Sequence, residues 1–183
     1  MLDPEQMMKD TKQLTIGLKR ADRLTELERT NLQNWFCEEF GQMLPFEFAE
    51  PDWYLLAYIE KDLVGRIGIL KRTILVDGEE WHVGGISGVI VRKAWRSHGI
   101  SKRITKEACD FIRDQLKVDF GLLFCRDELI PLYQECGWDV IRTKTIFSQS
   151  TGKSTHPRDF LMMQELSGKK WPKGEVDLNG LPW

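Results

Sequence analysis

The chain has 183 residues, 42% of them hydrophobic and 30% charged, and its 26 basic and 28 acidic side chains give a net charge of -2. A chain of this length can bury about 70% of its unfolded surface, so we expect one domain spanning residues 1–183. The balanced charge provides no field to attract nucleic acid, and no run of about 18 apolar residues could span a bilayer, so we expect neither partner. The amino-terminal residues lack an apolar stretch behind a basic start, which predicts a cytoplasmic protein rather than a secreted one.

The first predicted element is a helix over residues 25–41. Thr25 and Glu28 have the spacing of a capping box, in which each residue satisfies a backbone group of the other. The apolar side chains that follow predict an amphipathic helix with one inward face. That face is expected to carry Leu27, Leu32, Trp35, Phe36 and Phe40. Residues 43–52, which mix prolines with acidic and aromatic side chains, predict a loop.

Three antiparallel strands are predicted next, over residues 53–60, 63–76 and 79–92. The last two are separated by Asp77 and Gly78, a dipeptide that strongly favours a two-residue hairpin turn. The third strand contains three glycines, and glycine inside a strand indicates a β-bulge or a close backbone approach. They are Gly84, Gly85 and Gly88.

The second half of the chain predicts alternating helices and strands. We expect helices at 99–117 and 127–137, and strands at 118–125, 138–149 and 160–167. The strands at 118–125 and 138–149 flank a helix and should therefore be parallel neighbours. The two tryptophans of residues 168–183 predict that this tail packs on the body. The expected fold is α/β, of the α+β type, with a mixed, mostly antiparallel sheet of about six to seven strands flanked by helices.

The loop between the third strand and the next helix is cationic, with Arg92, Lys93, Arg96 and His98 preceding Gly99. A helix start offers unpaired N–H groups and a partial positive charge, which favour a phosphate or pyrophosphate group. A solvated connection whose basic side chains face water is the alternative.

The residues Arg96-Ser97-His98-Gly99-Ile100-Ser101 resemble the loop signature of the GNAT superfamily of N-acetyltransferases, although Ser101 stands where Gly or Ala is usual. The run LYQECGW, Leu132 to Trp138, resembles the second signature of the family. The resemblance implies that acetyl-CoA is the co-substrate, held in a cleft where the strand ending near Val91 splays from the parallel strand containing Leu122 to Cys125. It further implies that the pantetheine arm pairs with Val89, Ile90 and Val91, and that the pyrophosphate lies on the amides of Arg96, Ser97, His98, Gly99, Ile100 and Ser101.

The same resemblance implies a catalytic arrangement. Tyr133 stands where the family often keeps the general acid that protonates the leaving thiolate, and a core tyrosine is the alternative reading. A backbone N–H near Val89 or Ile90 would stabilise the oxyanion. Ser87 is the base candidate that faces the cleft, and other candidates by position are Glu47, Glu79 and Glu80. We expect no metal, because His82, His98 and His156 have no neighbouring metal-ligating residues in the sequence.

Within the superfamily, the chain most resembles the aminoglycoside 2'-N-acetyltransferases, through FEFAEPDW at residues 46–53, the run at 86–100, LYQECGW and the final GLPW. The resemblance implies that Glu47, Ser87 and Trp183 contact the acceptor, with Asp177 as the nearest carboxylate of the tail. Two residues depart from that group: Ser87 replaces a glutamate, and Leu181 replaces an acidic residue.

The sequence therefore predicts an acetyl-CoA-dependent N-acetyltransferase that acts on a primary amine of a small molecule, an aminoglycoside or aminocyclitol among the candidates. The amine would attack directly, through a tetrahedral intermediate. Two alternatives stay open: acetylation of a protein or peptide amine, and a non-catalytic acyl-CoA-binding module. The sequence leaves open whether the chain forms a homodimer.

Overall fold

The computed structural model describes residues 14–41, 46–155 and 160–183, and its strands join in one sheet of ten. The strands are β1 (Leu14–Arg20), β2 (Trp53–Ile59), β3 (Asp62–Val76), β4 (Glu79–Val91), β5 (Phe120–Cys125), β6 (Asp139–Ile141), β7 (Thr145–Gln149), β8 (Gly152–Thr155), β9 (Phe160–Glu165) and β10 (Val176–Asp177). Their order is β6-β9-β5-β4-β3-β10-β7-β8, and β2 joins β3 to β1 beside this path.

The predicted count of six to seven strands was wrong, because several short strands carry little sequence signal. The predicted strand at 138–149 is divided into β6 and β7. The polar strand β8 and the two-residue strand β10 have no apolar alternation. Strand β1 pairs with β2 along its whole length but exposes most of its residues.

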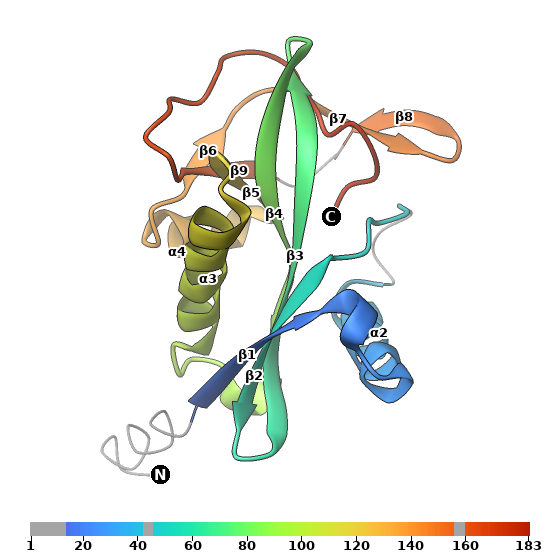
Figure 1. Cartoon of the computed structure of the whole chain (residues 1–183), viewed down its shortest axis with the longest axis vertical. Coiled ribbons are helices and arrows are strands. Elements are labelled where there is room, and N and C mark those ends of the chain that lie inside the picture. Colours follow the sequence, from blue (N-terminus) through green and yellow to red (C-terminus); the bar gives the residue numbers. More distant parts are fainter. Residues whose placement is uncertain (1–13, 42–45, 156–159) are drawn as a thin grey trace.

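The long β3–β4 hairpin runs through the centre of the molecule (Figure 1). Its turn is formed by Asp77 and Gly78, with φ of 48° and 84°. Positive φ at both central residues is the requirement of the predicted hairpin turn, so that prediction is confirmed. The hairpin positions β4, whose far end carries most of the candidate site.

Two longer helices, α2 (Glu26–Phe40) and α3 (Ile100–Phe111), lie on opposite sides of this hairpin (Figure 1). The capping box of α2 is present as predicted, with Thr25 and Glu28 each bonded to the other. The predicted inward face was wrong, because Leu32 is 2% exposed but Leu27 is 70% exposed. Five helical residues turn the chain by about 500°, so these two leucines cannot share one face.

Helix α3 is the crossover between β4 and β5, which are parallel neighbours. It continues as a π-helical turn over Ile112–Leu116, within the span that the sequence predicted. The expected pairing of 118–125 with 138–149 was wrong, because β9 lies between β5 and β6 and is antiparallel to both. The short helix α4 (Ile130–Gln134) connects β5 to β6.

Apolar side chains fill both faces of the sheet. On the α3 face, Ile67 and Ile86 pack with Ile104 and Ile112. On the opposite face, the buried cluster contains Val83, Phe120, Leu122, Phe147, Val176 and Trp183. A Cβ at Gly84 would lie 2.3 Å from Ile112, and one at Gly85 would lie 2.5 Å from the Trp183 ring. These glycines therefore let a helix and the C-terminal tryptophan approach β4 closely. Within the ranges described, the structure has no helix of the length and apolarity needed to cross a membrane.

Candidate active site

Strand β4 bends at a β-bulge near its end. Arg66 of β3 pairs with Ile90, whereas Gly68 pairs with Ser87, so two residues of β4 lie opposite Ile67. A bulge leaves its extra residue outside the ladder and bends the strand. Gly88 is one of these two residues, and its φ of 52° suits glycine. The prediction of a bulge at one of the β4 glycines is therefore confirmed.

Strands β4 and β5 separate just before this bulge. Their parallel pairing covers only Val83–Ile86 and Phe120–Leu123. Beyond that point β4 continues to Val91 without β5 as a partner. The separation leaves the last residues of β4 without a strand partner on the β5 side.

The loop from Arg92 to Gly99 joins the end of β4 to α3. Ser97 and Gly99 both have positive φ, 66° and 72°. Gly99 is the N-cap of α3 and supplies no side-chain cap to the first helical turn. A Cβ at Gly99 would meet nothing within 4 Å. Uncapped N–H groups at the start of a long helix can bind an anion, and the space in front of Gly99 is open to one.

Arg96 holds this loop in place. Its Nε donates a hydrogen bond to the Val91 carbonyl at 3.0 Å, and its Nη2 lies 2.9 Å from Oε2 of Glu39. His98 Nδ1 lies 2.7 Å from the Arg96 carbonyl oxygen, which can only accept, so Nδ1 carries the proton. The Arg96 side chain and the Arg96 amide, which donates to the Lys93 carbonyl, are thus both engaged within the protein. The uncapped amides at the start of α3 are the donors left for an anion.

A cavity of about 430 Å³, named the loop cavity, lies between this loop, the end of β4 and α4. It brings together eight of the predicted site residues: Val89, Ile90, Val91, Arg96, Ser97, Ile100, Ser101 and Tyr133. His98 and Gly99 belong to the same loop but are not among its lining residues.

Tyr133 is 7% exposed, and its ring lies 6.3 Å from the Trp138 ring in a T-shaped arrangement. Burial raises the pKa of Tyr133 above its usual value, so the phenol stays protonated at neutral pH. Its carbonyl accepts hydrogen bonds from the amides of Cys136 and Trp138, which close the turn after α4. Side chain and backbone together fix the position of this phenol beside the loop cavity.

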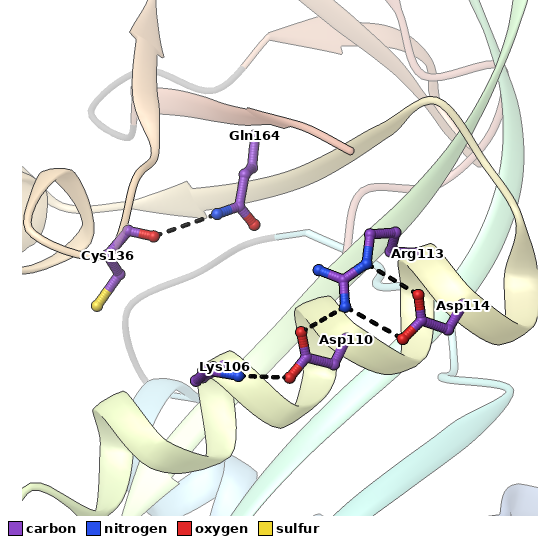
Figure 2. A network of polar contacts seen from close by, with 6 residues as sticks. All are labelled: Lys106, Asp110, Arg113, Asp114, Cys136 and Gln164. Carbon is purple, nitrogen blue, oxygen red and sulfur yellow. Dashed lines mark hydrogen bonds and ion pairs between the residues drawn. The ribbon is translucent and has the colours of Figure 1, made fainter. Parts of the chain in front are cut away.

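The turn after α4 is also attached to the sheet. Figure 2 shows Gln164 of β9 directed at the Cys136 carbonyl, to which its Nε2 donates a hydrogen bond of 3.2 Å. The same view shows exposed ion pairs along α3 between Lys106, Asp110 and Arg113. Exposed pairs of this kind contribute about 0.2–1 kcal/mol each, so apolar packing is the main anchor of α3.

A second cavity, of about 320 Å³, lies between α2 and the sheet and is named the α2 cavity. Ser87 lines it together with Arg66, Tyr54, Phe36, Phe48 and Glu50. Phe40 lines both cavities. Ser87 and Val89 thus stand on either side of Gly88, one lining each cavity.

Arg66 is the site residue that the sequence analysis missed. It is 3% exposed and donates from Nη1 to the Leu32 carbonyl at 3.0 Å. A Cβ at Gly88 would lie 2.5 Å from its Nη2, so the guanidinium lies against the bulge. A sequence signal was present: Arg66 is the one charged residue within the apolar run LVGRIGIL.

The remaining predicted acceptor residues are not among the residues that line either cavity. Glu47 accepts a hydrogen bond from the Ser150 amide, and Asp177 pairs with Lys153. Trp183 packs on Phe124 and is buried against Gly85.

The other acid and base candidates are also placed at a distance from the cavity linings. Glu79 and Glu80 lie at the turn end of β4, where His82 Nδ1 is 2.9 Å from Thr73 Oγ1. His156 falls outside the described residues. In the part of the chain that the structure describes, no group of three or more His, Cys, Asp or Glu side chains could hold a metal ion.

A family model of the acetyltransferase (GNAT) domain matches residues 40–141, which include β4, β5, the loop before α3 and the helix α4. The chain belongs to the GNAT acetyltransferase family. It is accordingly an acetyl-CoA-dependent N-acetyltransferase. The family match does not distinguish the aminoglycoside 2'-N-acetyltransferase group, which stays a prediction.

Solved GNAT structures have the same fold. ElaA from Escherichia coli is 19% identical, with a TM-score of 0.62 over 83% of this chain and 99% of that one. YhbS from Escherichia coli, crystallised in complex with CoA, is 15% identical, with a TM-score of 0.57 over 93% and 95% of the two chains. A GNAT acetyltransferase from Elizabethkingia anophelis with acetyl-CoA bound is 13% identical, with a TM-score of 0.54 over 84% and 99%. At these identities the likeness concerns the fold.

Proposed function

We propose that this GNAT enzyme transfers an acetyl group to a primary amine of a small molecule, with acetyl-CoA in the loop cavity and the acceptor in the α2 cavity. The observation that carries this proposal is the position of the two cavities. They lie on either side of the bulge, with Val89 lining the loop cavity, Ser87 lining the α2 cavity, and Phe40 lining both. Two substrates bound there would meet at the end of β4.

The residues around the loop cavity suit acetyl-CoA. Bound acetyl-CoA would supply the acetyl thioester. The backbone of Val89–Val91, freed from β5, can pair with the pantetheine arm as an added strand. The uncapped amides at the start of α3, with the open space in front of Gly99, can hold the pyrophosphate.

Tyr133 is assigned as the general acid. Attack by the amine forms a C–N bond and breaks the C–S bond, the leaving thiolate requires a proton, and the amine must lose one. The Tyr133 phenol is held protonated by burial and lines the cavity assigned to the thioester. Ser87, 7% exposed in the α2 cavity, is placed to accept a hydrogen bond from the amine, and water can carry its proton away.

Amino sugars are the acceptor class that the sequence resemblance implies, through Glu47, Ser87, Asp177 and Trp183. A polycation needs several carboxylates, because each exposed ion pair contributes only about 0.2–1 kcal/mol. Among the described residues that line the α2 cavity, Glu50 is the one carboxylate. The cavity therefore supports a small amine better than a polycationic sugar.

The test is release of free CoA thiol from acetyl-CoA, with aminoglycosides, aminocyclitols, polyamines, amino acids and a lysine peptide as separate acceptors. Turnover of at least one small amine, reduced in Tyr133→Phe, is the expected result. Turnover of the peptide alone would replace the small-molecule acceptor with a protein one. Tight acetyl-CoA binding without turnover of any amine would favour a non-catalytic acyl-CoA-binding module.

A further inference from the structure

Arg66 places a buried positive charge in the wall of the α2 cavity. Arg66 is a charged residue of β3 and yet is only 3% exposed. Its chain neighbours Gly65 and Ile67 pack in the apolar core. The Phe36 and Tyr54 rings lie 5.5 Å and 5.2 Å from its Cζ. Both rings also line the cavity. The guanidinium is therefore buried in contact with two aromatic rings.

No acidic side chain in the part of the chain described pairs with this charge. Nη1 donates to the Leu32 carbonyl, while Nε is buried and has no hydrogen-bond partner among the described residues. Within the same limits, Nη2 makes no hydrogen bond or ion pair. Glu50, the nearby carboxylate of the cavity, is largely exposed and lies 3.7 Å from Arg29. Buried arginine is rarely left without an anion, since the guanidinium cannot neutralise itself by losing a proton.

A structural role explains only part of this arrangement. The bond from Nη1 to Leu32 joins α2 to the sheet and uses one of five N–H donors. The ring contacts lie over the guanidinium, and its edge formed by Nε and Nη2 has no hydrogen-bond partner among the described residues. The edge formed by Nε and Nη2 presents two parallel N–H groups, which is the geometry that binds a carboxylate through two hydrogen bonds.

We propose that this edge of Arg66 binds a carboxylate of the acceptor, so the acceptor is a small aminocarboxylate. The inference rests on the proposed function, because that function places the acceptor in the α2 cavity. Nη2 lies against Gly88, the bulge residue between Ser87 and Val89. The carboxylate would thus sit within a few bonds of the amine that is acetylated, and α-amino acids and their close analogues have this spacing.

The lowered pKa of Arg66 agrees with this view. Burial is its main cause, and the only opposing influence is the Tyr54 phenol, with no carboxylate contributing. A bound carboxylate would supply the missing negative charge. The aromatic rings would pack on the apolar part of the acceptor.

The experiment compares the twenty free L-amino acids with their α-amides, which keep the amine and lose the negative charge. We expect the wild-type enzyme to turn over at least one amino acid with kcat/KM about tenfold or more above that of its amide, as expected when a charged hydrogen-bonding partner is lost. In Arg66→Met, KM for that amino acid should rise about 10- to 100-fold, and the preference for the amino acid over its amide should be lost. Arg66→Lys keeps the charge but loses the paired donors. Its KM for the amino acid should lie between those of the wild type and of Arg66→Met.

A second measurement needs no variant and guards against misfolding of Arg66→Met. Simple carboxylates without an amine, such as butyrate and phenylacetate, should raise the Tm of the wild-type enzyme and inhibit competitively with the acceptor. Equal turnover of acids and amides, or a preference for amino sugars, together with no effect of these carboxylates, would overturn the proposal while leaving the acetyltransferase assignment intact. Loss of the proposed function would look different, since acetyl-CoA would then bind without turnover of any amine or would fail to bind.

Discussion

Glu39 and Arg96 form an ion pair, with Oε2 and Nη2 2.9 Å apart, that joins the end of α2 to the loop before α3. The pair brings a carboxylate into the lining of the loop cavity, where the proposed ligand is an anion. Arg96 keeps its bond to the Val91 carbonyl independently of Glu39.

Glu39→Gln should therefore strengthen acetyl-CoA binding, because it removes a like charge without releasing the loop. The expected gain is about two- to fivefold at low salt and should shrink as salt is added. Calorimetric titration at two ionic strengths measures it, with Glu38→Gln as control, since Glu38 is exposed and does not line the cavity. Weaker binding in Glu39→Gln would mean that the ion pair is needed to shape the loop.

Gly99→Asp should weaken acetyl-CoA binding strongly, by at least about 30-fold, because it places a negative charge at the start of α3. Gly99→Asn is the matched control, since Asn has nearly the same size and tolerates the same positive φ of 72°. A Cβ at this position meets nothing within 4 Å. Equal affinities of the two variants would remove the pyrophosphate from the start of α3.

Tyr133→Phe should lower kcat by about 100-fold, within the usual range for a general acid, with little change in acetyl-CoA affinity. Because burial raises the pKa of Tyr133, the wild-type phenol stays protonated past the ordinary value of about 10. The kcat of the wild type should accordingly not decline between pH 8 and about 10 through loss of this proton. Tyr58→Phe, a half-buried tyrosine on β2 away from both cavities, is the control. A normal kcat in Tyr133→Phe would leave that tyrosine a packing residue.

Leu32→Ala should destabilise the protein by about 2–5 kcal/mol, because a fully buried leucine is lost from the only buried position of α2 within the described range. Leu27→Ala should change the free energy of unfolding by less than about 0.5 kcal/mol, since Leu27 is exposed. Urea denaturation of both variants tests how α2 is packed. Similar losses in the two would show that α2 is rotated relative to the sheet.

Local signals predicted the elements around the candidate site. The capping box at Thr25, the Asp77-Gly78 turn and the cationic loop each depend on residues a few positions apart, and each was located correctly. The glycines of β4 were also read correctly, since one forms a bulge and two allow close packing.

Long-range pairing was the part that the sequence did not reveal. Strand β9 inserts between β5 and β6 from a later part of the chain, and no local pattern specifies such a partner. Arg66 was overlooked for a related reason. Its role depends on α2, whose Leu32 carbonyl and Phe36 ring contact it from 34 and 30 positions away along the chain.

Phe40 borders both cavities and is the one residue that their described linings share. If the donor and the acceptor bind as proposed, they occupy separate cavities whose described linings share Phe40. Either substrate should then be able to bind while the other is already bound. We therefore expect no substrate inhibition, since a high concentration of one substrate does not block the cavity of the other.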